Sequence, residues 1–378
     1  MMLVLNNAQV VLPDREMDGG SVVIEDGRIA SVSDGTAGQG FDLTGLVLVP
    51  GFIDVHIHGA VGIDVMDATA DQLCAISEFL AMQGVTAWLP TFVPAADRNY
   101  ASAVEAIAKA AQTSRGARVL GVHYEGPFVN SAQCGALHTE YFKTYSGPSD
   151  VDGLPVPSGL VRMITLAPEV DGGVELVREL KSRGWAISIG HTRAPLGVLD
   201  RAFEAGARHM THFMNAMAPV HHRAPGPIAW GLSRDDVTCD VIADGIHLDP
   251  FMLRLLMKVK RSRGIALISD AIAAAGKGDG DYNIWGETIT VKNGRTSNAA
   301  GSIAGSVITM LDAVRMMRSL GVSYVDLAAI ASSNLARLLG VDRECGSIEI
   351  GKRADLVALD DAGNVKLTLI GGDVVFRA

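Results

Sequence analysis

One apolar run opens the regular part of the chain and ends in two histidines: Phe52-Ile53-Asp54-Val55-His56-Ile57-His58. A short run rich in apolar and β-branched residues is typical of a strand that is buried on both faces. Side chains alternate along a strand with a period of two, so His56 and His58 are predicted to share one side. The run therefore predicts a buried strand that presents two imidazoles together at its C-terminal end.

Runs of the same kind recur down the chain, separated by alanine- and leucine-rich segments of helical periodicity such as Ala70–Gln83 and Tyr100–Ala111. The predicted strands are Phe52–Ile57, Val85–Phe92, Val119–Tyr124, Val161–Ala167, Ala186–Gly190, His209–Phe213, Val237–Ala243 and Ile265–Ser269. Eight successive strand-then-helix units predict an α/β fold, a (β/α)8 barrel of the TIM-like class.

The two ends of the chain have a different pattern. Short strands there are broken by turn signals, such as Asp26-Gly27 near the start and Gly371-Gly372 near the end. We expect residues 1–49 and 345–378 to form one small β-sandwich domain, and residues 50–344 to form the catalytic barrel. The Gly- and Asp-rich stretch Gly276–Gly280 is predicted to be a surface loop.

Composition excludes several classes of protein. The chain has 378 residues, 48% of them hydrophobic, which excludes intrinsic disorder. Its net charge of −10 argues against nucleic acid or an anionic membrane as partner, since both attract a basic face. The apolar stretches are too short to span a bilayer, and the N-terminus lacks the basic start of a secretory signal. Four scattered cysteines fit a reducing compartment, so we expect a cytoplasmic protein.

Polar residues capable of binding metal follow six of the predicted strands, where the active sites of such barrels lie. They are His56 and His58 after strand one, Glu125 after strand three, His191 after strand five, His212 on strand six, Asp244 and His247 after strand seven, and Asp270 after strand eight. A single histidine at a strand end is usually a hydrogen-bonded structural residue, but that explanation does not account for the whole set. Imidazole and carboxylate ligands are typical of a catalytic divalent ion that keeps a position open for water.

These residues also carry a family resemblance. The segments Val49–His58 and Gly351–Val357, together with His191, His212 and Asp270, resemble the amidohydrolase superfamily. Within it the chain is similar to the N-acetylglucosamine-6-phosphate deacetylase family in His123–Phe128, Thr211–Pro219, Asp244–His247, Ser269–Gly276 and Ala304–Ser306. The resemblance covers nearly the whole chain, and Asn215-Ala216-Met217 is its most specific part.

The resemblance implies a role for each matching residue. Glu125, His191 and His212 would hold the ion that every member keeps, and His56 and His58 would add a second ion bridged by Glu125. One or two divalent ions are therefore expected, with zinc as the leading candidate and iron as the alternative. Asp270 matches the catalytic carboxylate, and His247 would polarise the acetyl oxygen. The substrate contacts would be Ala136, Asn215, Ala216, Arg223, His247, Ile303, Ala304 and Gly305.

Two segments depart from the family pattern. The loop Gln133-Cys134-Gly135-Ala136-Leu137-His138 has its histidine one place late and Cys134 in place of a basic residue. Cys134 is either a small residue on a mobile loop or part of a lid over the substrate. The pair His221-His222 before Arg223 either adds to phosphate binding or lies on an exposed loop. The Arg223 guanidinium offers a planar fork suited to phosphate oxygens.

The expected activity is hydrolysis of the acetamide of N-acetyl-D-glucosamine 6-phosphate to D-glucosamine 6-phosphate and acetate. The expected partners are this small amino-sugar phosphate and a second copy of the chain in a homodimer. One alternative is another amidohydrolase reaction, a deaminase or cyclic amidase, on a different small molecule. The other is a non-enzymatic scaffold, which the full set of His56, His58, Glu125, His191, His212 and Asp270 argues against.

Overall fold

The computed structural model describes residues 2–113 and 115–378. All eight predicted barrel strands are present, and they pair in parallel in the order of the chain. They are β6 (Phe52–Ile57), β9 (Val85–Phe92), β11 (Gly121–Glu125), β12 (Val161–Leu166), β13 (Ala186–Ile189), β14 (His209–Met210), β15 (Thr238–Ile242) and β16 (Ile265–Ile268). A short strand, β10 (Arg118–Val119), also pairs with β9.

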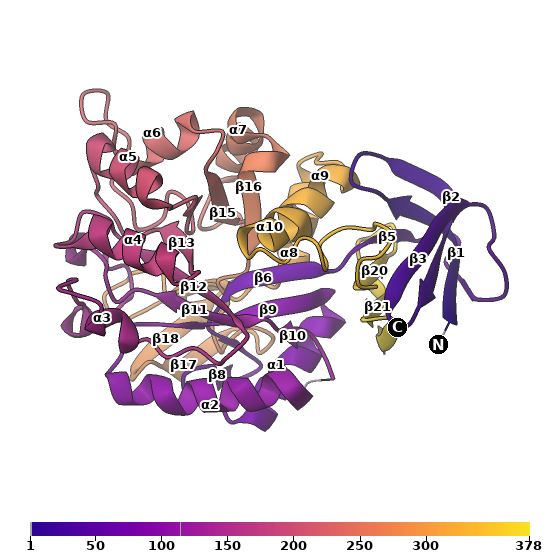
Figure 1. Ribbon diagram of the computed structural model, residues 1–378, viewed down its shortest axis with the longest axis horizontal. Coiled ribbons are helices and arrows are strands. Elements are labelled where there is room, and N and C mark those ends of the chain that lie inside the picture. Colours follow the sequence, from indigo (N-terminus) through magenta and orange to yellow (C-terminus); the bar gives the residue numbers. More distant parts are fainter. Residues whose placement is uncertain (1, 114) are drawn as a thin grey trace.

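The barrel closes between its first and last strands. The Asp270 N–H donates to His56 O at 2.9 Å, and the His58 N–H donates to Ala271 O at 2.8 Å. These bonds join the C-terminal end of β6 to the segment that follows β16, and a parallel bridge links Ile57 to Ala271. The predicted (β/α)8 fold is therefore confirmed (Figure 1).

Helices cover the outside of the barrel (Figure 1). They are α1 (Ala70–Met82), α2 (Asp97–Thr113), α3 (Ser149–Asp152), α4 (Gly173–Ser182), α5 (Leu196–Ala205), α6 (Gly226–Ser233), α7 (Pro250–Lys260), α8 (Met310–Ser319), α9 (Tyr324–Ala328) and α10 (Asn334–Leu338). The helix α1 begins at a capping box, in which Thr69 and Gln72 satisfy each other's backbone N–H groups. Its buried residues, which include Leu73, Ile76 and Leu80, recur at helical spacing and form part of the large barrel core.

Both ends of the chain contribute to one further sheet of eight strands, and both termini lie in it (Figure 1). Its strands are β1 (Met2–Val11), β2 (Glu16–Glu25), β3 (Arg28–Asp34), β4 (Phe41–Asp42), β5 (Val47–Pro50), β20 (Leu356–Leu359), β21 (Val365–Ile370) and β22 (Asp373–Arg377). Leu48 and Leu356 join this sheet's own core, whereas their neighbours Val49 and Val357 join the barrel core. Side chains alternate along a strand, so β5 and β20 each present one face to the core of the terminal sheet and the other to the barrel core. These two strands thereby attach the terminal sheet to the barrel. The exact domain limits at residues 49/50 and 344/345 stay a prediction.

Two parts of the barrel differ from expectation. The strand predicted for His209–Phe213 ends at Met210, because the backbone turns into the left-handed region at His212 (φ 30°). Residues 276–279 form an exposed loop, as predicted, but Gly280 already belongs to an antiparallel sheet that was not predicted. That sheet contains β17 (Gly280–Ile284), β18 (Glu287–Lys292) and β19 (Arg295–Ser297). A smaller hairpin, β7 (Gly59–Ala60) and β8 (Ile63–Asp64), follows the first barrel strand.

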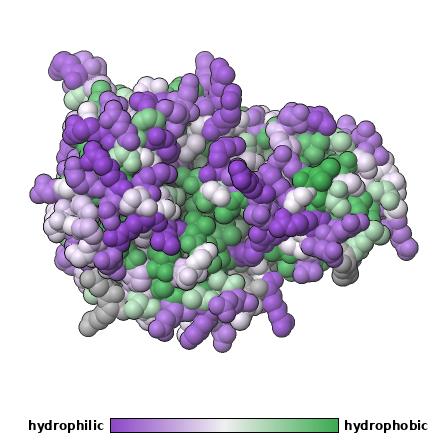
Figure 2. All heavy atoms as spheres, viewed as in Figure 1, coloured by the Kyte–Doolittle hydropathy of each residue, from purple (hydrophilic) through white to green (hydrophobic). Residues whose placement is uncertain are grey.

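Hydrophilic and hydrophobic residues are unevenly distributed over the surface. On the face drawn in Figure 2, hydrophilic residues predominate along the edges and hydrophobic ones gather toward the centre and over part of the terminal sheet. Within residues 2–113 and 115–378, no helix combines the length and the apolar character needed to cross a bilayer. All four cysteines are free thiols, and Cys239 and Cys345 are buried.

Candidate active site

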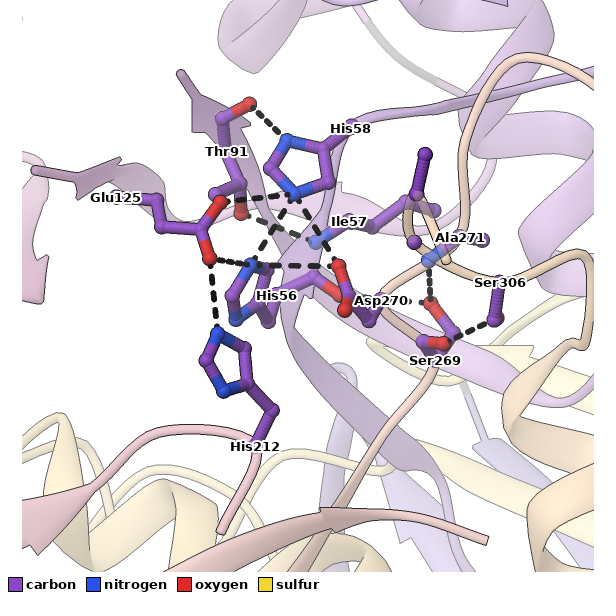
Figure 3. Close-up of polar contacts among 12 residues, drawn as sticks. His56, Ile57, His58, Thr91, Glu125, His212, Ser269, Asp270, Ala271 and Ser306 are labelled. Carbon is purple, nitrogen blue, oxygen red and sulfur yellow. Dashed lines mark hydrogen bonds and ion pairs between the residues drawn. The ribbon is translucent and has the colours of Figure 1, made fainter. Parts of the chain in front are cut away.

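Five side chains converge at the C-terminal end of the barrel. His56 and His58 come from the end of β6, Glu125 from the end of β11, and His191 and His212 from the turns after β13 and β14. The Nε2 atoms of His56 and His58 lie 3.2 Å apart, and those of His191 and His212 lie 3.1 Å apart. Glu125 lies between the two pairs, with Oε1 2.9 Å from His191 Nε2. Its Oε2 lies 3.4 Å from His58 Nε2 (Figure 3). The predicted metal ligands are thus brought together.

The hydrogen bonds of the imidazoles indicate that a cation belongs here. The Nδ1 atoms of His58, His191 and His212 lie 3.1, 2.7 and 3.2 Å from the backbone carbonyl oxygens of Thr91, Gln133 and Asn215. A carbonyl only accepts, so each Nδ1 carries a proton, and each Nε2 is the nitrogen that can offer a lone pair to a cation at the centre. Lone pairs 3 Å apart repel unless a positive charge lies between them. Among the described residues, His56-His58-Glu125 and Glu125-His191-His212 are the groups that can hold a metal ion.

The pKa shifts in the cluster also indicate that a positive charge belongs there. Burial by itself lowers the pKa of His58, but Asp270 and Glu125 outweigh it and raise that pKa to about 10. In the same way burial lowers the pKa of His212 and Glu125 raises it, to about 9. Burial raises the pKa of Glu125, whereas His56, His191 and His212 hold it well below its usual range. The site therefore favours positive charge, which a divalent ion supplies more compactly than several protons.

The closing seam of the barrel places Asp270 beside the first pair of histidines. Asp270 Oδ1 lies 3.2 Å from His58 Nε2 and 3.5 Å from His56 Nε2 (Figure 3). Below it, the buried Asp54 carboxylate accepts the Ser269 hydroxyl at 2.5 Å and the His56 N–H at 3.3 Å. Burial raises the pKa of Asp54 to about 6. This network ties β6 to the end of β16, so His56 and Asp270 keep a common position.

Three of the predicted site residues have a left-handed backbone conformation. His191 (φ 47°), His212 (φ 30°) and Asp270 (φ 50°) all adopt the region that costs most residues roughly 1–3 kcal/mol. Asp240 supports His212: one carboxylate oxygen accepts the His212 N–H, and the other lies 2.8 Å from His209 Nε2. Both Asp240 and His209 are fully buried. This geometry turns the chain sharply at the strand ends and aims the side chains at the barrel axis.

A pocket of about 300 Å³ opens above the cluster. Its lining includes Asp270 and four of the five predicted metal ligands. It also includes the predicted substrate contacts Ala136, Asn215, Ala216, His247, Ile303 and Gly305. His247 Nδ1 lies 2.7 Å from Asp244 Oδ2, which leaves Nε2 as the nitrogen that can face a substrate. Ala304 is fully buried beside the pocket. Asn215 Nδ2 is buried and has no hydrogen-bond partner among the described residues, so it is a donor suited to a ligand.

Not every predicted contact reaches this pocket. Arg223 lies on the exposed loop before α6, where its guanidinium lies 2.5 Å from His222 Nε2. His221 and His222 are exposed as well, with their rings 4.4 Å apart. Arg223 is therefore not among the residues that line this pocket, whereas Asn215 and Ala216 are.

Sequence reasoning missed Trp285, which also lines the pocket. Its ring meets the ring of His58 edge-on, with centroids 5.2 Å apart. The turn was detectable, because Trp285-Gly286 separates two stretches with alternating polar and apolar residues. Nothing in the local pattern shows that this hairpin folds back over the barrel.

Comparison with known proteins agrees with the fold. The family model described as "Amidohydrolase family" matches residues 47–375. The N-acetylglucosamine-6-phosphate deacetylase of Bacillus subtilis is 37% identical, covering 99% of this chain and 97% of its own length. The N-acetylgalactosamine-6-phosphate deacetylase of Escherichia coli O157:H7 is also 37% identical, over 87% of each chain.

A solved structure adds a substrate complex to the comparison. An aspartate-to-alanine mutant of the Mycobacterium smegmatis N-acetyl-D-glucosamine-6-phosphate deacetylase, in complex with N-acetyl-D-glucosamine-6-phosphate, superposes with a TM-score of 0.90. It is 30% identical, and the match covers 100% of both chains. This chain belongs to the amidohydrolase family, whose members depend on metal. Within it, the relatives described above are sugar-phosphate deacetylases.

Proposed function

We propose that this protein is a deacetylase that hydrolyses the acetamide of N-acetyl-D-glucosamine 6-phosphate to D-glucosamine 6-phosphate and acetate. Such a reaction serves amino-sugar catabolism and cell-wall recycling. The observation that carries the proposal is the convergence of four imidazole Nε2 atoms and Glu125 beside Asp270 at the base of one pocket. Relatives of nearly equal length, named for this activity, support the choice of substrate.

We propose that Glu125, His191 and His212 hold one divalent ion and that His56 and His58, with Glu125 as bridge, hold a second. Nitrogen and oxygen donors without cysteine suit zinc best, with iron as the alternative. Bound there, a divalent ion supplies a water molecule whose pKa is lowered toward ~7.

Asp270 is the proposed general base and acid. Burial raises its pKa, but the charge of His56 and the hydrogen bond with His58 outweigh burial, so its pKa is lowered and the carboxylate is ionised at neutral pH. Asp270 takes the proton of the attacking water and returns it to the sugar nitrogen as the C–N bond breaks. His247, oriented by Asp244, donates a hydrogen bond to the acetyl oxygen and stabilises the charge that develops there.

Asn215 and the backbone at Ala216 are the proposed contacts for the sugar phosphate, with Ala136 and Ile303–Gly305 beside them. We propose that the protein is a cytoplasmic homodimer and that Arg223 reaches the phosphate of the partner's site. Two observations support this: Arg223 lies on an exposed loop outside its own pocket, and Val220 on the same loop is 56% exposed. An exposed apolar residue in such a position is typical of an interface.

The C4 epimer is a second candidate substrate, because the Escherichia coli relative is named for the galactosamine compound. A deaminase or cyclic amidase is less well supported, since the relatives described above are deacetylases. The test is to load the purified chain with zinc and compare kcat/KM for the 6-phosphates of N-acetylglucosamine and N-acetylgalactosamine, and for unphosphorylated N-acetylglucosamine. We expect the first to be the best substrate. A lack of acetate release from both phosphorylated sugars would refute the proposal.

A further inference from the structure

Trp285 separates the catalytic pocket from a second cavity. The second cavity has a volume of about 410 Å³ and is lined by Asp64, Met66, Tyr141 and Asn283, among others. Trp285 lines this cavity and also the catalytic pocket. Its indole is therefore a wall with open volume on both sides.

The backbone at Trp285 is unusual for so large a residue. Ile284 pairs with Glu287, so Trp285 and Gly286 alone form the turn between β17 and β18. Both have positive φ, 55° and 81°, as a type I′ turn requires. Asn, Asp and Gly favour this first turn position, whereas a bulky aromatic side chain is an outlier there. Strain of this kind persists where surrounding contacts hold it, and it is concentrated at functional sites.

The contacts of the hairpin hold the indole over the cluster. Ile284, Ile289 and Val291 are buried in a small core beneath the hairpin, and Trp285 packs against that core. The indole meets His58 edge-on, with an interplanar angle of 84°. His58 Nε2 is in turn 3.2 Å from Asp270 Oδ1. Trp285 and the proposed proton-transfer group therefore flank the same histidine.

The orientation of the substrate follows from this arrangement. The reacting carbonyl must lie within reach of Asp270 and the ligand histidines, while the sugar extends toward Asn215 and Ala216. Those two residues follow β14, which lies three strands from β6 around the closed barrel. The acyl substituent then points away from the sugar and toward the wall at His58. That wall is Trp285.

We propose that Trp285 limits the length of the acyl group that this enzyme removes, an inference that rests on the proposed deacetylase function. With the indole in place the pocket ends at Trp285. Removal of the indole joins the pocket to the second cavity and gives a longer acyl chain room to extend. Trp285 is thus a specificity-determining residue contributed by the β17–β18 hairpin.

The test compares N-acetyl-, N-propionyl- and N-butyryl-glucosamine 6-phosphate as substrates of the zinc-loaded enzyme, with release of glucosamine 6-phosphate as the common readout. We expect kcat/KM of the unaltered enzyme to fall roughly 10-fold for each added methylene. Trp285→Ala should raise the butyryl-to-acetyl ratio of kcat/KM at least ~10-fold, and Trp285→Phe about threefold. A ratio of two substrates is independent of the fraction of enzyme that is folded.

Tyr141→Ala is the matched control, because it removes an aromatic ring from the second cavity but leaves the indole wall in place. Its ratio should stay within about twofold of the unaltered enzyme. Metal content and unfolding temperature are measured for every variant, so that loss of zinc is not mistaken for a change in selectivity. An unchanged ratio in both Trp285 variants would overturn the inference while leaving the deacetylase intact. Failure of the unaltered enzyme on the acetyl substrate would instead overturn the proposed function.

Discussion

Asp270 combines burial, which by itself disfavours an ionised carboxylate, with a left-handed backbone, and this combination indicates a functional role. It is only 7% exposed, and its backbone is left-handed. Its N–H and C=O are both bonded, to His56 O and to the Ser306 N–H. These backbone bonds hold Asp270 beside His58, so its carboxylate does not have to move to reach a substrate.

Replacement of Asp270 by asparagine removes the proton acceptor but keeps the size and shape of the side chain. We expect kcat to fall at least ~10²-fold, with substrate still bound, because Asn215 and His247 lie on other strands. Since the pKa of Asp270 is lowered, the activity of the unaltered enzyme should fall only on the acid side, as this carboxylate gains a proton. That acid limb should be absent from the residual activity of the variant. Near-normal kcat with normal metal content would contradict the role of Asp270.

Asp240 offers a second test at the level of one residue. Asp240→Leu removes the acceptor for the His212 N–H and should weaken metal binding by ~10–100-fold, as loss of a supporting contact does elsewhere. Asp240→Asn should keep most of the affinity, because its carbonyl can accept from His212 while its amide donates to His209 Nε2. Metal titration of both variants measures the difference. Equal affinities for Leu and Asn would show that Asp240 does not position His212.

At the scale of single elements, the βα turns of the barrel need support because their geometry is irregular. The loop after β13 illustrates this support: Glu169 accepts the Thr192 hydroxyl at 2.6 Å and the Arg193 N–H at 2.6 Å. The same carboxylate accepts from Asn130, on the loop that follows Glu125, at 2.9 Å. One side chain thus joins the loops that follow two metal-ligand positions.

The end of α6 depends on Lys260, a residue of α7 that is 4% exposed. Its ammonium donates to the backbone oxygens of Gly231 and Val237 at 2.8 Å each, and also to Arg234 O. Lys260→Met keeps the stem but leaves these carbonyls without their donor. We expect the free energy of unfolding to fall by about 2–4 kcal/mol, measured by denaturant titration.

Lys258→Met is the control for that experiment, because Lys258 lies on the same helix but is exposed. Its effect should stay within about 0.5 kcal/mol. A loss of similar size in both variants would show that the hydrogen bonds of the buried Lys260 ammonium do not add to the free energy of unfolding.

At the scale of the whole molecule, the proposed metal ligands come from the ends of β6, β11, β13 and β14, so an ion bound by them would link strands around much of the barrel. Removal of metal by a chelator should abolish activity, and added zinc should restore it. The unfolding temperature should also fall, because an ion that binds only the folded state stabilises it by about 4 kcal/mol at 1,000 times its Kd. Metal analysis and calorimetry give both results. His191→Ala should behave like the metal-depleted protein, and full activity in a verified metal-free sample would contradict the proposed chemistry.

The assembly proposal leads to a test on Arg223. Arg223→Ala should lower kcat/KM for N-acetylglucosamine 6-phosphate by ~10²-fold, the scale of a lost charge-assisted contact, but should barely affect the unphosphorylated sugar. Arg201→Ala, an exposed arginine on α5, is the control and should change neither. Equal losses on both sugars would make Arg223 structural. A monomer by light scattering with full activity would refute the shared site.

Much of the fold could be predicted from the sequence because the patterns that indicate strands and helices are local. Apolar runs and helical periodicity predicted the eight barrel strands and the helices α1 and α2, since both depend on residues near in sequence. The period of two predicted that His56 and His58 meet, and their Nε2 atoms do lie 3.2 Å apart. Because the active sites of such barrels lie at the C-terminal ends of the strands, Glu125 and Asp270 were predicted to lie near these histidines.

The sequence by itself thus determined the barrel, the chemical nature of its donor set and the strand ends from which those donors come. Only the tertiary structure decided the left-handed turn at His212, its support by Asp240, and the position of Arg223 outside its own pocket. It also decided that the β17–β18 hairpin places Trp285 against His58. The physical reason is that loops have no periodicity. The direction of a loop side chain depends on a few backbone angles, and these are set by contacts with residues far away in the sequence.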